Sequence, residues 1–389
     1  MIYFLLILVF IVVLIIVVDL FSQLNIWQSR IKIGQFVDEN HWQNKVVQVS
    51  IKWLKKTPTV KLTDNNRFIL IDIFKGNYKR KSIQHWQQAA LLLGLTQYYN
   101  KTKEQKIKTE IQNFINTQLN NDGTWKKPPQ EIDSVIMGYA LITIPFLDKQ
   151  QYKPAFDTIY QLILNLKGID GTIAYKKHNQ QFRFVDTIGF ICPFLVVYGT
   201  AFQVPEAVDL SLNQISTYNK YGMLHNTYIP CHTYVLNSKL PAGLYGWGRG
   251  LGWYAIGLID VWNALPDSHF AKKTVEENVI LFAKTALQFQ NENGSFHWLI
   301  VDKSSRLDSS TAATLGWFFI QASKIPSIET ECKIASKKSL QYLQTVTQRN
   351  GAIDFSQGDT KAIGVYSKEF SILPFTQGFC LRNIQYSKR

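Results

Sequence analysis

A short turn element recurs five times along this 389-residue chain, and it constrains the fold more than any other feature. Each copy places a glycine after a polar residue and before an aliphatic or aromatic one. The five copies lie at 121–125, 169–175, 221–225, 293–298 and 350–355. Asn-Gly and Asp-Gly pairs favour tight turns because glycine adopts a positive φ without steric cost. Their recurrence indicates a fold built from repeated units.

The segments around these turns have the apolar spacing of helices, which predicts twelve helices in six pairs. The expected ranges are 43–56, 80–100, 104–120, 133–147, 152–167, 186–200, 206–218, 249–265, 272–291, 309–324, 329–348 and 369–385.

Two kinds of helix alternate in this pattern. Segments before the turns, such as 104–120 and 272–291, are amphipathic with a charged face, as expected of an outer layer. Segments after the turns, such as 133–147, 186–200 and 309–324, are apolar nearly all round and are expected to be buried. Six amphipathic helices around six buried ones describe an all-α toroid, a closed ring of helix pairs. An open α-solenoid is the alternative, because it also accommodates twelve helices.

The N-terminus carries an uninterrupted apolar run over residues 2–18. At about 1.5 Å per residue this run nearly spans a hydrocarbon core of roughly 30 Å. No Lys or Arg precedes the run and no small-residue cleavage site follows it, which favours an uncleaved anchor over a signal peptide. We expect a single-pass anchor over 1–21, a linker over 22–42 and the barrel over 43–389. Arg30 and Lys32 follow the anchor and favour a cytoplasmic barrel, although long domains often override this rule.

The charge balance favours anionic partners. Lys and Arg number 42 against 28 Asp and Glu, a net charge of +14, which suits acidic polysaccharide, acidic lipid or nucleic acid. No basic run is denser than 79–81, so a nucleic-acid partner is not expected. The cysteines form no C-x-x-C pair and are expected to be buried thiols: Cys192, Cys231, Cys332 and Cys380. Three histidines lack metal-ligand spacing and are expected in turns or the core: His178, His232 and His297.

The toroid also predicts where the chemistry lies. If every turn precedes an inner helix, the inner-helix N-termini meet at one end of the ring, and the polar residues before each apolar run converge there. These are Asp133, Asp186, the 247–253 cluster, Ser309 and Ser310. Helix N-termini present unpaired N–H groups and partial positive charge, which suits an anionic ligand. Plain N-capping is the competing interpretation of the Asp and Ser residues.

Four segments resemble a known family. WGRGLGW at 247–253 resembles the W-G-R-G-x-G-W helix start of the unsaturated glucuronyl and rhamnogalacturonyl hydrolases, glycoside hydrolase families 88 and 105. VDTIGFICPFLVVYG at 185–199 and IDSVIMGYALI at 132–142 resemble the segments that carry that family's catalytic Asp and its second Asp. SSTAATLGWFF at 309–319 resembles a later element. The resemblance runs from about residue 45 to the C-terminus and implies an (α/α)6 barrel.

This resemblance implies hydration of an unsaturated sugar. The implied substrate is a short acidic oligosaccharide whose non-reducing end is a 4,5-unsaturated uronic acid. An acid protonates C4 of the vinyl ether, water adds at C5, and the resulting hemiketal collapses to release the next sugar. This chemistry lies outside the scheme of paired carboxylates in ordinary glycosidases. It implies no metal and no nucleotide cofactor.

The resemblance also implies residue roles. Asp186 becomes the general acid and base, while Asp133 binds sugar hydroxyls or assists charge stabilisation. Arg249 supplies a positive fork near the substrate carboxylate or hydroxyls, and Trp247 and Trp253 offer apolar faces to a sugar ring, with core packing as the alternative. Three further residues are expected at the substrate. Gly250 allows close approach of the backbone, Ser310 acts as a cap or a ligand, and His225 matches a family histidine.

Departures from the family pattern leave other functions open. Ile132 and Ile136 stand where polar residues are expected, so the substrate is undetermined and loss of activity is an alternative. A second hypothesis is a membrane-anchored barrel that binds or trims acidic glycan during surface polysaccharide biosynthesis. A third is a terpene-cyclase-like toroid, suggested by QLNNDGTW at 118–125, but the chain has no D-x-D-D motif.

Overall fold

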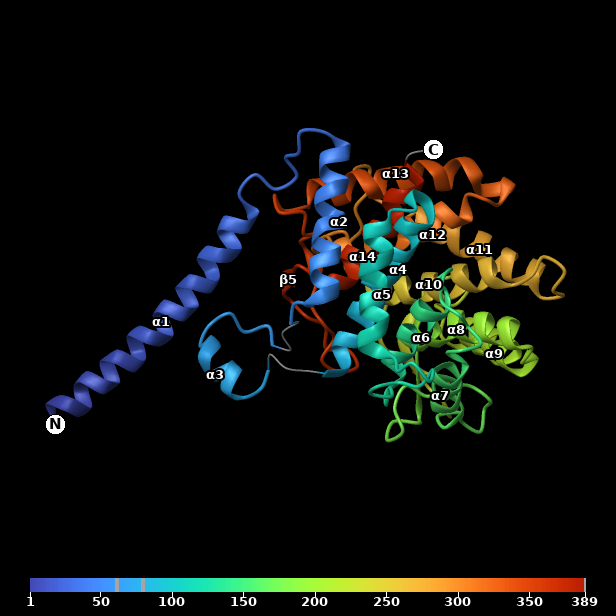
Figure 1. Ribbon diagram of the computed structural model, residues 1–389, viewed down its shortest axis with the longest axis horizontal. Helices are drawn as coiled ribbons and strands as arrows, with labels where there is room; N and C mark the ends of the chain where they lie inside the picture. Colours follow the sequence, from blue (N-terminus) through green and yellow to red (C-terminus); the bar gives the residue numbers. More distant parts are fainter. Residues whose placement is uncertain (60–62, 78–80, 388–389) are drawn as a thin grey trace.

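The computed structural model describes residues 1–59, 63–77 and 81–387, and twelve of the helices in this part of the chain form a barrel of two layers (Figure 1). The inner layer comprises α4 (Lys81–Thr102), α6 (Val135–Ile142), α8 (Val185–Phe202), α10 (Gly248–Ala264), α12 (Ser309–Ala322) and α14 (Pro374–Ser387). The outer layer comprises α2 (Glu39–Lys55), α5 (Gln105–Gln118), α7 (Lys153–Leu164), α9 (Pro205–Tyr221), α11 (Lys272–Leu287) and α13 (Glu329–Thr345).

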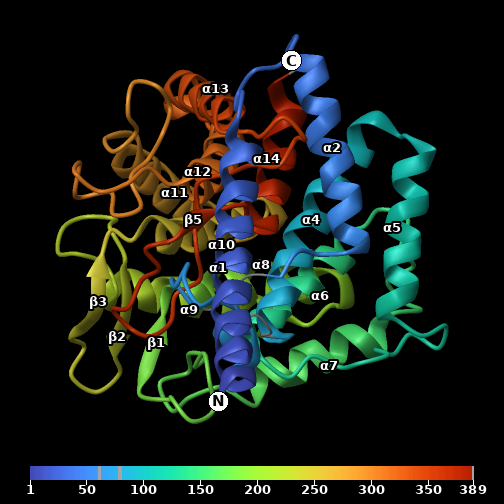
Figure 2. The same cartoon turned by 90° about the vertical axis from the view of Figure 1, so that its left-hand side faces the viewer.

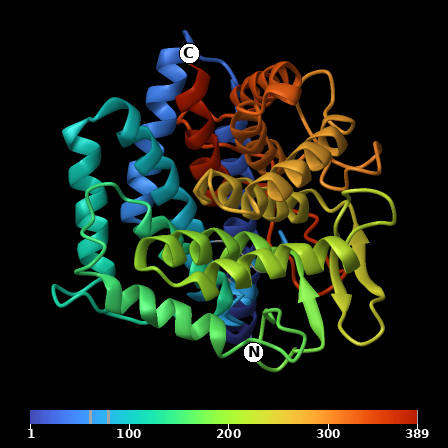
Figure 3. The same cartoon turned by 90° about the vertical axis from the view of Figure 1, so that its right-hand side faces the viewer.

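The inner helices close into a ring. Each packs on the next in chain order, and α14 returns to pack against α4. This closure requires close backbone approach, because a Cβ on Gly94 of α4 would lie 2.4 Å from the carbonyl oxygen of Gly378 on α14. Figure 2 shows the barrel from the side of the N-terminal helix, and Figure 3 shows the opposite side, where the green to orange helices face the viewer. The all-α toroid is confirmed, and an open solenoid is excluded.

Burial follows the predicted division of helices. Every residue of α6 and α12 is buried, whereas α5 buries one stripe of residues on its inward face: Ile107, Ile111, Phe114 and Ile115. A helix with one apolar stripe covers a core, and a helix that is apolar all round belongs inside it. The spacing of apolar residues was therefore sufficient to assign the layers.

The turn glycines are not all alike. Gly123, Gly171, Gly294 and Gly351 have φ between +74° and +98°, as expected of tight Asx-Gly turns. Gly222 has φ of −100°, so its turn does not need the left-handed region. Glycine is required there for space, because a Cβ would lie 2.3 Å from the Tyr218 ring.

Five short strands accompany the helices, and none was predicted. β1 (Phe182–Phe184), β2 (Cys231–Val235) and β3 (Pro241–Tyr245) form an antiparallel sheet in that order. β4 (Ser356–Gln357) pairs with β5 (Phe370–Ser371). The expected helix start at residue 369 was wrong, because β5 occupies that stretch and α14 begins at Pro374, a residue favoured in the first turn.

The N-terminal helix stands apart from the barrel. α1 (Ile2–Arg30) is continuous over 29 residues, none of them buried, and its mean hydropathy over an 18-residue window is 3.5. Its length and composition suit a membrane span. α8 passes the same test of length and hydropathy, but 72% of its apolar window is buried in the barrel. A short helix that the sequence did not predict, α3 (Ile69–Phe74), lies beside α1 (Figure 1).

Candidate active site

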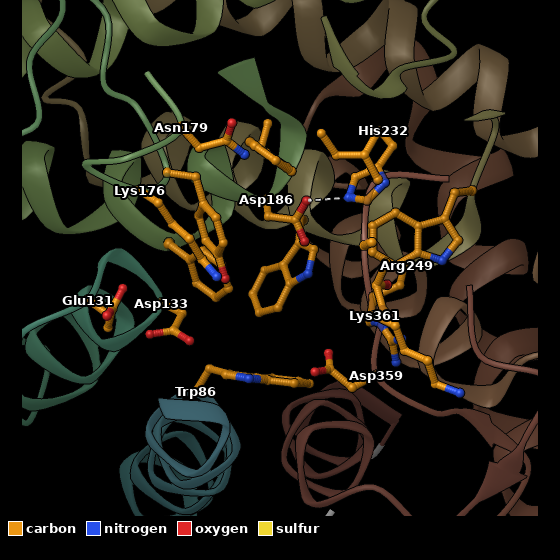
Figure 4. Close-up of a pocket in the computed structure, with 18 of the residues that line it drawn as sticks. Trp86, Glu131, Asp133, Lys176, Asn179, Asp186, His232, Arg249, Asp359 and Lys361 are labelled. Carbon is orange, nitrogen blue, oxygen red and sulfur yellow. Dashed lines mark ion pairs between the residues drawn. The ribbon is translucent and has the colours of Figure 1, made fainter. Parts of the chain in front are cut away.

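A cavity of about 600 Å³ lies where several inner helices begin (Figure 4). Its wall includes five of the residues singled out from the sequence: Asp133, Asp186, Trp247, Arg249 and Trp253. Asp133 lies in the 3-10 helix η1 (Ile132–Ser134) that leads into α6, whereas Asp186 and Arg249 are the second residues of α8 and α10. Positions far apart in the sequence therefore meet at one cavity, as the ring topology predicts.

The Asp186 carboxyl group combines burial with an unsatisfied oxygen. Among the residues that the structure describes, none donates a hydrogen bond to its buried Oδ2 atom. The pKa of Asp186 is raised to about 7, chiefly by burial and also by the nearby charge of Asp359, against opposing effects of its own backbone N–H and of Arg249. The N-terminal helix dipole alone would lower this pKa. Loss of hydration outweighs the dipole, so Asp186 keeps a proton near neutral pH.

His232 faces Asp186 from strand β2. Its Nε2 atom lies 3.7 Å from Asp186 Oδ2, too far for a hydrogen bond. Burial, helped by the charge of Arg249, lowers the pKa of His232 to about 4, so the imidazole is neutral near pH 7. The Tyr366 hydroxyl lies 3.2 Å from His232 Nδ1 and accepts the Leu244 N–H at 2.9 Å, so its own proton is available to Nδ1. The other ring nitrogen, Nε2, is the one that faces Asp186.

Arg249 holds a wall of the cavity in place. Its Nη1 atom donates to the carbonyl oxygen of Gln357 at 2.5 Å, and Nη2 donates to that of Gly358. The guanidinium also lies 5.5 Å from the Trp247 ring. These bonds fix the chain where β4 leads into segment 359–363, which lines the cavity. Part of the guanidinium fork predicted for substrate is thus committed to the protein backbone.

The two indoles are packed as well as exposed to the cavity. Trp253 lies within an aromatic cluster, with centroid distances of 4.3 Å to Phe190, 4.7 Å to Phe375 and 5.7 Å to Trp86. Trp247 donates from Nε1 to Gln357 Oε1 at 2.9 Å. Both rings line the cavity. Core packing and ligand stacking, treated as alternatives in the sequence, therefore coexist at these positions.

Three other predicted substrate residues lie outside the cavity wall. His225 is exposed in the loop after α9. Ser310 is fully buried, and its hydroxyl donates to Asp308 Oδ2 at 2.6 Å, so it belongs to the cap of α12. A Cβ on Gly250 would lie 2.9 Å from Trp247 Cε3, so this glycine makes room for the indole rather than for a ligand. The structure gives these three positions no contact with the cavity.

Several lining residues were missed in the sequence. Trp86 lies inside the inner helix α4 and Asp359 lies in the loop between β4 and β5, so neither is a polar residue directly before an inner helix. His178 lies in a turn and His232 is buried on β2, as expected, but both also line the cavity, which the sequence did not indicate. The remaining members of the wall are Glu131, Tyr175, Lys176, Asn179, Phe184, Phe190 and segment 360–363. Within the described ranges, no cluster of three or more His, Cys, Asp or Glu side chains is arranged to hold a metal ion.

Comparisons with known proteins agree with this architecture. The model of the family described as Glycosyl Hydrolase Family 88 matches residues 58–381. A family 105 glycoside hydrolase from C. acetobutylicum superposes with a TM-score of 0.70 at 18% identity, covering 82% of this chain and 98% of its own. A possible family 105 member from Klebsiella pneumoniae superposes with a TM-score of 0.76 at 14% identity, covering 91% of this chain and 94% of its own. An unsaturated glucuronyl hydrolase from Bacillus sp. GL1 superposes with a TM-score of 0.66 at 14% identity, covering 90% of this chain and 97% of its own. At these identities the superpositions establish the fold.

Proposed function

Because this chain belongs to glycosyl hydrolase family 88, we propose that this glycoside hydrolase removes a terminal 4,5-unsaturated uronic acid from an oligosaccharide by hydrating the C4=C5 double bond. One observation carries the proposal. The cavity holds a carboxyl group, Asp186, whose pKa is raised to about 7. A general acid works best when its pKa lies near the working pH, because it is then both protonated and able to release its proton.

The proposed reaction uses one residue twice. The Asp186 proton passes to C4, and positive charge develops at C5, where the ring oxygen shares it. Water then attacks C5 while the Asp186 carboxylate takes one proton from it, which restores the acid. The product is a hemiketal at C5 that opens and releases the next sugar. No covalent sugar–enzyme bond is formed in this sequence.

The cavity wall suits a charged sugar. Arg249 and Lys176 bring positive charge to the wall, whereas Trp86 and Trp253 present indole rings. Apolar faces of pyranose rings pack on indoles, and cations favour the uronate carboxylate. We assign Asp133, which is buried at the same wall, to binding sugar hydroxyls.

The test follows the ultraviolet absorbance of the substrate double bond. The full chain in detergent is mixed with unsaturated disaccharides prepared by lyases from glycosaminoglycan, pectin and other acidic polysaccharides. Hydration removes the conjugated double bond, so absorbance falls with the native chain and stays constant with Asp186→Asn. A constant trace on every substrate argues against the proposal. Saturable binding of these glycans without any absorbance change would instead favour the second hypothesis, a membrane-anchored barrel that binds acidic glycan.

We also propose that α1 anchors the enzyme in a membrane. The side chains of the apolar run 2–18 are exposed or nearly so. The helix continues beyond the expected anchor, and Arg30 at its end pairs with Asp354 at 2.9 Å, so 22–30 is helical and fixed to the barrel. Retention in membranes after alkaline carbonate washing, with residues 1–30 intact by mass spectrometry, tests the anchor. In this proposal the barrel lies on the cytoplasmic side, which Arg30 and Lys32 favour. Because the native cysteines are all buried, labelling of an introduced cysteine, Phe270→Cys, in intact cells tests that side.

A further inference from the structure

The short helix α3 exposes an apolar patch that the barrel leaves uncovered. Four side chains form it, with exposed fractions of 54%, 41%, 48% and 88% in order: Phe68, Ile71, Ile73 and Phe74. The side chains that the helix buries are Ile69 and Asp72. Arg67 and Lys75 are exposed at the two ends of the patch. Clustered exposed apolar side chains between cations are typical of a surface that contacts lipid headgroups and acyl chains.

The N-terminal helix holds this patch at a defined height. Asp19 of α1 accepts hydrogen bonds from the backbone N–H groups of Phe68 at 2.7 Å and Ile69 at 3.0 Å, at the start of α3. Asp19 is also the first charged residue after the apolar run 2–18. A carboxyl group is costly in hydrocarbon, so we expect Asp19 to lie at or beyond the edge of a bilayer that α1 spans. With α1 as the proposed anchor, the start of α3 is held at the level of Asp19, just beyond the apolar run.

We propose that α3 is a second membrane contact, with its apolar patch in the interfacial layer and Arg67 and Lys75 among anionic headgroups. This inference rests on the proposed anchoring by α1. The run 2–18 is about 26 Å long as a helix, close to the hydrocarbon thickness, which leaves Asp19 and α3 just outside it. The contact removes apolar surface from water, and it fixes the rotation of the protein about α1.

The same segment reaches the wall of the cavity. Asp64 accepts hydrogen bonds from Ser367 Oγ at 2.6 Å and from the Lys368 N–H at 3.0 Å. It also pairs with Lys361 Nζ at 2.8 Å, and Lys361 lines the cavity. Figure 1 shows α1 and α3 on the side of the barrel that carries β5, the strand that follows this wall, and Figure 2 shows β5 on the side that α1 faces. In this proposal the α3 contact brings the part of the barrel that carries segment 359–363 and β5 nearest to the bilayer.

The experiment measures the depth of nitroxide labels on the full chain. The native cysteines are all buried, so a single introduced cysteine is labelled selectively. Phe74→Cys reports on the patch. Phe270→Cys is the matched control, because Phe270 is 83% exposed in the loop between α10 and α11, on the side of the barrel away from α1 (Figure 1). Val9→Cys reports on the anchor. The labelled proteins are placed in nanodiscs of phosphatidylcholine and phosphatidylglycerol, and label collisions with oxygen and with a water-soluble nickel complex are compared.

The expected ratio of oxygen to nickel collisions is about fivefold higher at position 74 than at position 270, with position 9 higher still. Equal ratios at 74 and 270, with position 9 in hydrocarbon, would overturn the α3 contact and leave the anchor standing. A label at position 9 that is open to the nickel complex would overturn both. Turnover of soluble unsaturated disaccharides by each labelled protein reports on the hydrolase separately, and it also shows that the barrel is folded.

Discussion

The Nε2 atom of His232 lies 3.7 Å from the Oδ2 atom of Asp186, yet between about pH 4 and about pH 7 neither group is charged. Burial raises the pKa of the carboxyl and lowers that of the imidazole. The pKa of the acid therefore lies above that of the base, whereas in an ion pair it lies below. A charged histidine would have drawn the proton off Asp186. The neutral imidazole instead shields a protonated carboxyl, which is the state that the proposed proton transfer to C4 needs.

Replacing the proposed acid should strongly slow turnover without loss of binding. We expect Asp186→Asn to lower kcat by about 10²- to 10⁴-fold, because the amide cannot release a proton, while KM changes little. The decrease of ultraviolet absorbance with unsaturated disaccharides measures both constants. Asp209→Asn, at an exposed position on α9, is the control and should behave like the native chain. Similar activity of Asp186→Asn and the control would remove Asp186 from the mechanism.

The pH dependence of turnover should follow the protonated carboxyl. Since the acid form of Asp186 is active and its pKa is about 7, kcat/KM should fall about tenfold for each pH unit above that value. Below it the rate should be flat until other groups titrate. Initial rates across a buffer series check this. A rate that rises through pH 7 would mean that the ionised carboxylate is the active form.

Removing the imidazole should move this pH midpoint. In His232→Ala water reaches Asp186 Oδ2, which stabilises the carboxylate, so the midpoint should shift to lower pH by about one unit. A purely structural role would lower activity at every pH without moving the midpoint. His225→Ala is the comparison, since His225 is exposed outside the cavity wall, and its profile should match that of the native chain.

The ring and its cavity were predictable because their signals are local. Apolar spacing is read within a single segment, and it assigned α6 and α12 to the interior without knowledge of the fold. Once helices alternate between layers, the topology places the starts of the inner helices together. Asp133, Asp186 and Arg249 follow from that rule, whereas Trp86, an apolar residue inside α4, does not.

What could not be predicted depends on contacts between distant segments. His232 reaches Asp186 because β2 pairs with β1, bringing Thr233 opposite Phe184 just before α8, and no local pattern marks these short strands. The role of Arg249 was also incomplete, because its carbonyl partners lie at residues 357 and 358. His225 was chosen by a sequence match alone, and its loop projects into solvent.

The hydrogen bonds from Arg249 to the cavity wall should be weakened even by a substitution that keeps the positive charge. Lysine carries one compact ammonium group, so it cannot donate to the carbonyl oxygens of both Gln357 and Gly358 with the geometry of a guanidinium. We expect Arg249→Lys to raise KM severalfold and to lower the free energy of unfolding by about 1 to 3 kcal/mol. Kinetics and urea unfolding measure these effects. Arg349→Lys, at an exposed position after α13, should change neither quantity.

The raised pKa of Asp186 also makes a prediction about stability. The folded chain keeps the Asp186 proton up to about pH 7, whereas an unfolded Asp releases it near its ordinary pKa of 3.8. The folded state therefore binds more protons between these values, and the contribution of Asp186 to the free energy of unfolding falls as pH rises through this window. Three pKa units correspond to roughly 4 kcal/mol, which is the largest effect expected.

Asp186→Asn removes this penalty, because an amide does not ionise. Relative to the native chain, the variant should gain stability progressively from about pH 4 and reach its full gain above about pH 7. Urea unfolding of both proteins across this range measures the difference, which cancels the contributions of other titrating groups. Asp209→Asn should show no such pH-dependent gain, since Asp209 is exposed. A constant difference between Asp186→Asn and the native chain would mean that the Asp186 carboxyl ionises equally in the folded and unfolded states, and the proton needed for hydration would then have to come from another group.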